Sequence, residues 1–400
     1  MRRPVLPPDK PWRVLICPDK FKGTLTATAA ATAIAAGWRR GRPGDLVTLL
    51  PISDGGDGFG ELLGSQLAAR EQRIETVDAA HRPIRATWWW EPRTQTAVVE
   101  SARIIGLAGL PAGRFHPFDL DTFGLGAVLR AVAKLRPQRC WIGIGGSATN
   151  DAGFGLARGL GWHFLDAARQ PITRWTDLIR LATVVPPRRP LALAQTLVAV
   201  DVRNRLLGVE GCTRVYGPQK GLRPADFEPA EANLRRLARM VAVARPDLRG
   251  VAQSRGTGAA GGLGYGLRVF AGARLVPGFG LFAEQTGLEA RIRDADVVIT
   301  GEGAIDATTL GMGKGVGDLA RRCHRRGIPC VGLAGSVRQP RLAGRVFARV
   351  AGIVPDVAGQ ADAIREPVRW LTELAFQIAR QGTIPVAPQR PSSASRSKGT

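Results

Sequence analysis

Hydrophobic and polar positions at the start of the chain follow the order expected for a β-α-β unit. The apolar run WRVLIC at 12–17 predicts a buried strand, and the turn PDKFKG follows it. An alanine-rich segment from about Thr26 to Arg39 predicts a helix, and LVTLLPIS at 46–53 predicts a second strand. This order implies a parallel sheet with helices on its faces, whose ligands gather at the carboxyl ends of the strands.

Further along, the pattern changes and later returns to its first form. From about residue 72, TWWWEP and TAVVESA are typical of antiparallel strands, and a helix is predicted at 123–134 before the strand RCWIGIG. The strand TLVAVDV and a helix at 228–244 come next, and DADVVITGEGAID at 294–306 restores the β-α-β order. We therefore expect a discontinuous parallel-sheet domain (1–76 and 290–385), an inserted α/β domain (77–289) and a disordered tail (386–400).

The charge of the chain is strongly basic but scattered. The formal net charge is +23, carried by 7 lysines and 49 arginines along the whole length. Because no helix-turn-helix, zinc-finger or aromatic-basic RNA signature accompanies this charge, we predict no nucleic-acid partner. The basic, proline-rich amino terminus lacks the apolar stretch of a secretory signal, and no segment has the roughly 18 apolar residues of a membrane span, so we expect no membrane partner and a cytoplasmic location. Five cysteines without CxxC spacing are expected to be reduced core residues.

The most informative segment is WIGIGGSATNDAGFG at 141–155. A hydrophobic strand runs directly into Gly145 and Gly146, and a hydroxyl, an amide and a carboxylate follow at Ser147, Asn150 and Asp151. Glycines let backbone N–H groups approach a ligand closely, and the side chains add donors and an anion near a helix start. This set of groups suits phosphate and a divalent cation.

Four other segments also end strands in small residues with carboxylates or lysines. They are PDKFKG, SDGGDG, DVRNRLLG with YGPQKG, and TGEGAID with GKG. Exposed turns need glycine but not repeated carboxylates, so we expect the five segments to share one active site. Carboxylates and lysines that converge in a cleft fit phosphoryl transfer, in which Mg²⁺ bridges nucleotide phosphates and an Asp accepts the proton of the acceptor hydroxyl.

The motifs also bear on other enzyme chemistries. The sequence TTLGMGKG around Lys314 lacks the first glycine and the final hydroxyl of a P-loop, so we do not expect a P-loop enzyme. GIGGSA does satisfy a dinucleotide-binding pattern, with Asp166 at the spacing of a ribose contact, so an NAD-dependent oxidoreductase is the alternative enzyme. The four histidines stand near none of the motifs in sequence, which argues against histidine acid–base chemistry or a zinc site.

Taken together, the motifs resemble those of the bacterial glycerate kinases. CPDKFKGTLTA (17–27), SDGGDGF (53–59), IGIGGSATNDAG (142–153), YGPQKGL (216–222) and TGEGAID (300–306) stand in the order of that family, and ESARIIGL, DTFGLG and GTGAAGGLG add to the likeness. The resemblance covers about residues 12 to 380. It implies a flavodoxin-like parallel-sheet domain, discontinuous in sequence, with a second inserted α/β domain, and an interdomain cleft that holds ATP, Mg²⁺ and glycerate. It also implies D-glycerate as substrate and 2-phosphoglycerate as product.

The resemblance also assigns candidate site residues, each at a position of this chain that matches a family motif. Catalytic candidates are Asp201 as the leading base, Lys22, Lys220 and Asp19. Substrate-binding candidates are Asn204, Glu302, Asp306 and Lys314. Nucleotide-binding candidates are Gly145, Gly146, Ser147, Asn150 and Asp151, and Asp54 with Asp57 are candidates for the metal.

Several positions depart from the family pattern beside these candidates: lysine at 20, arginine at 203 and 205, and alanine at 304. The loss of an arginine at 304 removes a bidentate clamp for a carboxylate, which Arg203 or Arg205 would have to replace. The exact hydroxy acid, the attacked hydroxyl and the oligomeric state therefore stay open. A non-catalytic hydroxy-acid binding protein on the same fold is a further alternative.

Overall fold

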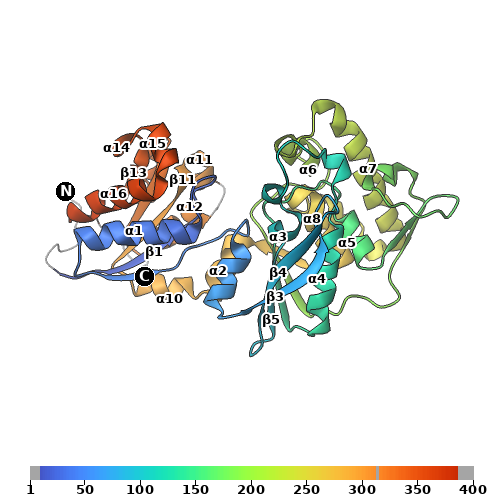
Figure 1. The fold of residues 1–400 in the computed structure, drawn as a ribbon, viewed down its shortest axis with the longest axis horizontal. Helices are drawn as coiled ribbons and strands as arrows, with labels where there is room; N and C mark the ends of the chain where they lie inside the picture. The colour runs from blue at the N-terminus through green and yellow to red at the C-terminus, as the bar shows by residue number, and fades with distance from the viewer. Residues whose placement is uncertain (1–9, 312–314, 386–400) are drawn as a thin grey trace, which may run out of the picture. The chain divides into compact units, whose positions relative to one another are not determined.

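The computed structural model describes residues 10–311 and 315–385, and the chain divides into two compact units. The first unit runs to Ser53 and resumes at Gly287, and the second unit comprises Asp54–Thr286. The predicted tail 386–400 and Lys314 lie outside the described residues. Each unit has its own sheet and its own core, and each is described separately (Figure 1).

In the described residues of the first unit, five parallel strands form a sheet of order β13-β12-β11-β1-β2. The two strands before the break in sequence thus occupy one side, and the three strands after it continue on the other. Numbered within the unit, the order is 2-1-3-4-5, which is the flavodoxin order. This confirms the predicted fold of the unit. The strands are β1 (Arg13–Pro18), β2 (Leu46–Leu49), β11 (Val297–Ile305), β12 (Cys330–Val337) and β13 (Arg349–Gly352).

One face of this sheet is covered by α1 (Ala27–Gly41) and α16 (Pro367–Arg380), which run side by side (Figure 1). The α1 helix begins at Thr26, whose Oγ1 accepts a 3.1 Å hydrogen bond from Ala29 N, as expected for an N-cap. Gly37 lets the helices approach closely, because a Cβ there would lie 2.1 Å from the carbonyl oxygen of Thr372. The other helices of the unit are α10 (Leu288–Arg293), α11 (Ala307–Gly311), α12 (Gly315–Arg325), α13 (Pro340–Ala343), α14 (Ile353–Asp356) and α15 (Gln360–Arg365).

The second unit contains a six-stranded mixed sheet of order β10-β9-β6-β5-β4-β3. Its first four strands are parallel, and β4 and β3 continue the sheet antiparallel. The parallel part places the carboxyl ends of neighbouring strands at one edge, where loops meet. The strands are β3 (Arg70–Val77), β4 (Pro83–Glu91), β5 (Thr96–Glu100), β6 (Arg139–Gly143), β9 (Gln195–Val200) and β10 (Arg274–Pro277), and a separate hairpin pairs β7 (His163–Leu165) with β8 (Thr183–Val185).

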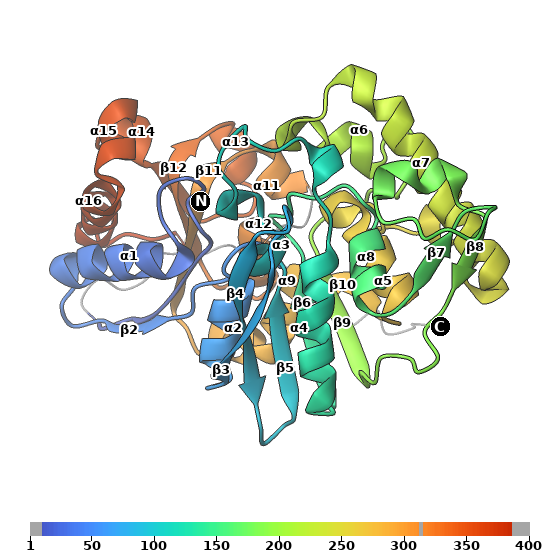
Figure 2. The same ribbon diagram turned by 45° about the vertical axis from the view of Figure 1, so that its right-hand side comes forward.

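Helices pack on the second sheet through two kinds of contact. The buried leucines and valines of α4 (Phe123–Lys134) join those of α8 (Ala259–Phe270) in one core with the strands, and Figure 2 shows α4 lying along the sheet. The helix α2 (Phe59–Gln66) instead lies against Trp89, since a Cβ at Gly60 would come 2.2 Å from the indole. The remaining helices are α3 (Ala102–Ile105), α5 (Phe154–Gly159), α6 (Cys212–Tyr216), α7 (Pro224–Ala244) and α9 (Gly278–Gln285).

The division of the chain falls earlier than the sequence pattern suggested. The first boundary was expected after residue 76, but the second unit begins at Asp54. The reason is that β3 pairs with β4 over its whole length, from Arg70 opposite Trp90 to Val77 opposite Pro83, and α2 packs on Trp89 of the same sheet. The second boundary, expected at 289/290, lies at 286/287. All five cysteines are buried and free, as expected for reduced core residues.

Candidate functional site

In the first unit, four of the candidate residues gather at the carboxyl ends of β1 and β11. Asp19 follows β1, and its backbone N donates a 2.8 Å hydrogen bond to the carbonyl oxygen of Gly301 in β11. The chain leaves β1 toward β2 on one side and leaves β11 toward β12 on the other, so this is the topological switch point of the sheet. Open α/β sheets bind ligands at such a point. Lys22 lies on the same loop as Asp19, with its backbone N 3.4 Å from the Cβ position of Gly303.

Glu302 and Asp306 are tied to the threonines that follow them. Thr309 Oγ1 donates a 2.8 Å hydrogen bond to Glu302 Oε1, and Asp306 Oδ1 accepts from Thr308 Oγ1 at 2.6 Å and from Thr308 N at 2.8 Å. The hydrogen bond from the Thr308 hydroxyl is the largest cause that holds the pKa of Asp306 below its usual value, and Arg338 adds to the effect. Asp306 is therefore a carboxylate at neutral pH, oriented by its own turn.

In the second unit, the SDGGDG and GIGGSATND segments are brought into contact. Gly145 N donates a 3.1 Å hydrogen bond to the carbonyl oxygen of Gly55, and a Cβ at Gly145 would lie only 2.5 Å from Gly56 Cα. Gly146 has φ +78°, and a Cβ there would lie 1.9 Å from Asp57 Oδ1. Glycine is required at 145 because the two backbones approach so closely, and at 146 because of the positive φ and the adjacent Asp57 carboxylate. The candidate phosphate loop and the candidate metal loop thus form one structure.

The carboxylate of Glu100 holds this double loop, and sequence reasoning missed it as a site residue. Glu100, the last residue of β5, accepts hydrogen bonds from Gly58 N at 2.8 Å and Gly60 N at 3.0 Å. It is 3% exposed, and burial raises the pKa of Glu100 against the effect of these donors and of Arg103. The signal in the sequence is a carboxylate that ends the buried strand TAVVE.

Lys220 is buried against the candidate phosphate loop, residues 143–151, on its protein-facing side. It ends the 3₁₀ helix Pro218–Lys220, is 7% exposed, and its Nζ donates a 2.6 Å hydrogen bond to the carbonyl oxygen of Thr149. Burial lowers the pKa of Lys220 to about 8. The loop is closed further by a 3.0 Å hydrogen bond between the hydroxyls of Ser147 and Thr149. The ammonium group therefore stabilises the backbone of the loop.

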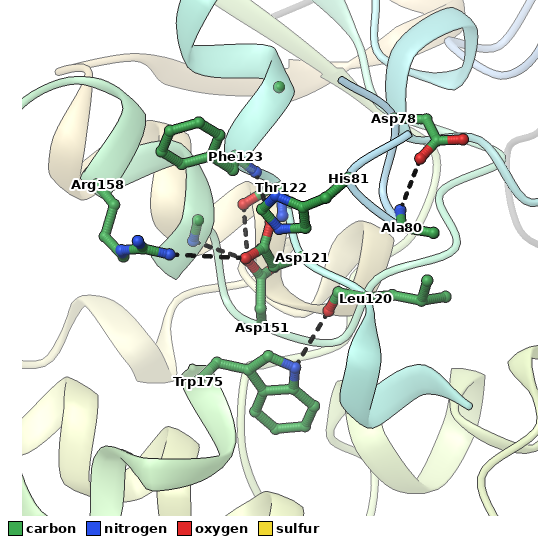
Figure 3. A network of polar contacts seen from close by, with 12 residues as sticks. Asp78, Ala80, His81, Leu120, Asp121, Thr122, Phe123, Asp151, Arg158 and Trp175 are labelled. Atoms are coloured by element: carbon green, nitrogen blue, oxygen red, sulfur yellow. Dashed lines mark hydrogen bonds and ion pairs between the residues drawn. The ribbon is translucent and has the colours of Figure 1, made fainter. Parts of the chain in front are cut away.

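Asn150 and Asp151 are fully buried in the same loop. Asn150 Nδ2 donates a 3.0 Å hydrogen bond to Thr213 Oγ1, while its Oδ1 finds no hydrogen-bond partner among the described residues. Asp151 Oδ2 accepts from Thr122 N at 2.9 Å, from Thr122 Oγ1 at 2.7 Å and from Gly155 N at 2.9 Å (Figure 3). The Asp151 carboxylate thus anchors the loop to the start of α4 from inside the protein.

A histidine adjoins this anchor, contrary to the expectation that the histidines stand apart from the motifs. His81 Nε2 lies 3.0 Å from Asp121 Oδ1, and Asp121 immediately precedes Thr122 (Figure 3). The hydrogen bond to Asp121 raises the pKa of His81, and the charge of Asp121 adds to the burial that raises the pKa of Asp151 to about 6. His81 is distant from Asp151 in sequence, so the motif spacing contained no signal for this neighbour.

Asp201 and Asn204 lie just after β9 in the second unit. Asn204 Nδ2 donates a 2.8 Å hydrogen bond to the carbonyl oxygen of Glu210, and Asn204 Oδ1 accepts a 2.5 Å hydrogen bond from the Tyr216 hydroxyl. Burial and the charge of Asp201 raise the pKa of Tyr216 to about 12. Asp201 is half-buried and sits close enough to influence that phenol, so it remains a base candidate with access to solvent.

The donor set at the double loop fits magnesium with two protein carboxylates. Asp54 is half-buried and Asp57 exposed, on a loop where Asp54 Oδ1 accepts from Gly56 N at 3.3 Å. Within residues 10–311 and 315–385, no group of three or more His, Cys, Asp or Glu side chains is arranged to hold a metal. Mg²⁺ commonly binds to one or two carboxylates and completes its octahedron with water and phosphate oxygens, so two carboxylates suffice.

The geometry does not favour the dinucleotide alternative. A Rossmann glycine loop opens directly into its helix, whereas here α5 starts only at Phe154 and is six residues long. Asp166, the predicted ribose contact, closes a turn by accepting a 2.8 Å hydrogen bond from Gln170 N.

Among the described residues, none of the helices combines the length and the apolar character needed to cross a membrane.

Comparisons with known proteins cover nearly all of the chain. Residues 14–383 match the model of the glycerate kinase family. A glycerate kinase from Halalkalibacterium halodurans is 34% identical over 92% of this chain and 97% of its own length, and the glycerate 2-kinase from Escherichia coli K12 is 32% identical over 81% and 85%. A crystal structure from Salmonella typhimurium LT2, described as a glycerate kinase 2, superimposes with a TM-score of 0.76 at 32% identity and covers 93% of this chain and 98% of that one.

Proposed function

The chain belongs to the glycerate kinase family, whose members phosphorylate glycerate, and from this premise we propose that it transfers the γ-phosphoryl group of ATP to D-glycerate and forms 2-phosphoglycerate. The 2-hydroxyl oxygen attacks the γ-phosphorus, the bond to the β–γ bridging oxygen breaks, and ADP leaves. Asp201 accepts the hydroxyl proton. When bound, Mg²⁺ offsets negative charge on the nucleotide phosphates, with Asp54 and Asp57 as its protein ligands.

The observation that carries the proposal is the contact between the loops 54–58 and 143–147. Gly145 brings the two backbones together, and the Asp57 carboxylate lies against the neighbouring Gly146. A triphosphate needs closely approaching backbone N–H groups and a cation, and this loop pair offers backbone N–H groups beside two carboxylates that could bind the cation. Gly146 and Ser147 are the proposed phosphate contacts, whereas Gly145 N already donates to the carbonyl oxygen of Gly55, so we propose that Gly145 shapes the loop. Asn150 and Asp151 are buried within the protein, so we propose that they shape the loop.

The switch point of the first unit supplies the proposed glycerate and phosphate contacts. Lys22 and Asp19 follow β1, Glu302 lies near the end of β11, and Asp306 directly follows that strand. The Lys22 ammonium offsets charge on the transferred group, and Asp19, Glu302 and Asp306 orient the hydroxyls of the substrate. The expected cleft between the domains and the role of Lys314 stay predictions. Lys220, expected to be catalytic, is proposed as a positioning residue because its Nζ is hydrogen-bonded beneath the loop.

The proposal is tested by supplying the purified chain with ATP, Mg²⁺ and one hydroxy acid at a time. D-glycerate, L-glycerate, tartronate and hydroxypyruvate are compared by direct measurement of ADP, and NADH formation from NAD⁺ is followed in separate reactions. We expect ADP release that depends on D-glycerate and on Mg²⁺, without formation of NADH. Phosphorus NMR of the product then identifies the phosphorylated carbon.

Other outcomes would select the alternatives. Glycerate-dependent NADH formation would support an oxidoreductase. Glycerate binding by calorimetry without ADP release in the presence of MgATP would support a binding protein. ADP release with tartronate or hydroxypyruvate but not with D-glycerate would show that Lys20, Arg203, Arg205 or Ala304 has shifted the substrate preference.

A further inference from the structure

The carboxylate of Glu100 occupies the amino-terminal end of α2. Its two oxygens accept from Gly58 N and Gly60 N, two of the N–H groups that have no partner within a helix. An anion at this end is favoured by the helix dipole. Because the Glu100 carboxylate already accepts hydrogen bonds from these N–H groups, they cannot bind a phosphate. The contact at the end of α2 therefore has a structural role.

This structural role of Glu100 concerns the 54–58 loop, which carries the proposed metal ligands. Gly58 follows Asp57 directly and Gly60 follows Phe59, and Asp57 lies against Gly146 of the candidate phosphate loop. Glu100 is attached to the end of β5, which pairs in parallel with β6 up to Gly143. The Glu100 carboxylate therefore connects two parts of the unit. One is β5, which pairs with β6, the strand that leads into the candidate phosphate loop; the other is the loop that carries Asp54 and Asp57.

The surroundings of Glu100 leave few substitutes for its two acceptors. Trp89 and the Glu100 Cβ pack directly on Gly60, and Glu100 is 3% exposed. Arg103 Nε lies 3.7 Å from Glu100 Oε2 and Arg103 is also paired with Glu61 at 2.5 Å. Loss of the carboxylate would leave the buried N–H of Gly60 and the half-buried N–H of Gly58 without this acceptor, and the loop would have to move to satisfy them.

We propose that Glu100 is a positioning residue, which fixes the 54–58 loop in the form that lets Asp54 and Asp57 bind the magnesium of the nucleotide. The inference rests on the proposed function for the identity of the metal and the reaction. It differs from a purely stabilising role, because it predicts a change in magnesium dependence and in the local mobility of one loop. A group that only stabilised the fold would change neither at temperatures where the protein is folded.

The chain offers a matched control in Glu91. Its carboxylate also accepts two backbone hydrogen bonds within a turn, from Arg93 N at 2.9 Å and Thr94 N at 2.7 Å. Glu91 is 5% exposed and ends β4 of the same sheet, at the turn into β5. Glu91→Gln and Glu100→Gln therefore disturb the same kind of hydrogen bond, and only the second lies next to the proposed metal loop.

The test uses the full chain and compares three variants, Glu100→Gln, Glu100→Asp and Glu91→Gln, by two readouts. Hydrogen–deuterium exchange of the 54–66 segment reports the loop without any need for activity. The Mg²⁺ concentration that gives half-maximal ADP release reports the metal ligands. We expect Glu100→Gln to accelerate exchange in this segment and to raise the half-maximal Mg²⁺ concentration about tenfold, and Glu91→Gln to change it less than about twofold.

The outcomes separate this inference from the proposed function. Unchanged exchange at 54–66 in Glu100→Gln, or a Mg²⁺ dependence equal to that of Glu91→Gln, would overturn the inference. If Glu100→Gln does not fold, Glu100→Asp keeps the charge but shortens the reach, and the same two readouts decide. If the unmodified chain releases no ADP, the proposed function fails. Exchange at 54–66 with and without Mg²⁺ and ADP then still decides whether Glu100 holds the loop for the metal.

Discussion

Lys220 and Thr149 are joined by a 2.6 Å hydrogen bond from the lysine Nζ to the threonine carbonyl oxygen. The lysine is nearly fully buried, and Gly261 leaves it room, because a Cβ there would lie 2.8 Å from Nζ. A lysine within the motif YGPQKG thus acts on the backbone of GIGGSATND from behind. The contact links two motifs that are 71 residues apart in sequence.

This contact predicts an unusual pH dependence of stability. Burial lowers the pKa of Lys220 from 10.5 to about 8, so between these pH values the unfolded chain holds a proton that the folded chain has lost. The free energy of unfolding should therefore rise with pH in this window, by up to about 3 kcal/mol from this group. Urea unfolding of the wild type and Lys220→Met from pH 7 to 10.5 checks this. An identical pH slope in both proteins would contradict it.

Asp151 predicts the opposite slope on the acid side. Burial raises the pKa of Asp151 from 3.8 to about 6, so between these values the folded chain binds a proton that the unfolded chain lacks. Its contribution to stability therefore falls as the pH rises from about 4 to about 6. Asp151→Asn should flatten this part of the stability profile. It should also lower kcat/KM at least about tenfold at neutral pH, because the amide NH₂ faces the N–H donors of Thr122 and Gly155.

His81 is expected to stabilise the same region only while it is protonated. The hydrogen bond to Asp121 raises the pKa of His81 above 6.5, so the stabilisation is fully present below that pH and is lost as the pH rises through the folded pKa (Figure 3). His81→Gln should therefore lower the unfolding free energy at pH 6 and change it little at pH 9. His163, which is exposed, supplies the control His163→Gln. Equal losses at both pH values would argue that the ring acts by packing on Phe123.

The sequence predicts those parts of the fold whose signal is local. The helix expected at 123–134 is observed over Phe123–Lys134, and the strand expected at 12–17 is observed as Arg13–Pro18, because apolar periodicity and short turns decide both. The second unit starts at Asp54, before the predicted position after residue 76, because β3 belongs to this unit through its pairing with β4, a contact that periodicity does not encode. Non-local pairing also determines which motifs meet.

The prediction of site residues is limited in the same way: local motifs can be recognised in the sequence, but contacts between distant segments cannot. The glycines at strand ends predict a close approach of the backbone to a ligand, and the structure shows in addition that Gly145 packs closely on Gly56 of the neighbouring loop. The burial of a side chain cannot be predicted in this way, because it depends on which distant segments pack over it. Lys220 and Asp151 read as ligand contacts in the sequence, yet both are covered by other segments, while Glu100 and His81 were missed because their partners are distant in the chain.

Gly146→Ala should separate backbone strain from the position of Asp57. Gly146 has φ +78° and its Cβ site lies 1.9 Å from Asp57 Oδ1, so alanine both strains the backbone and displaces the carboxylate. Gly113 has φ +68° with nothing within 4 Å of its Cβ site, so Gly113→Ala imposes the strain alone. Both variants should lose about 1 kcal/mol of stability from the left-handed conformation.

Only Gly146→Ala should then change the chemistry. Moving the Asp57 carboxylate by more than an ångström weakens a metal site whose ligand distances tolerate only a few tenths of an ångström, so the half-maximal Mg²⁺ concentration for ADP release should rise about tenfold or more. Gly113→Ala should leave it within about twofold of the wild type. Activity against Mg²⁺, measured for the three proteins at one temperature where all are folded, makes the comparison. Equal Mg²⁺ dependence in all three would remove Asp57 from the metal site, because its carboxylate cannot stay in place beside an alanine at 146.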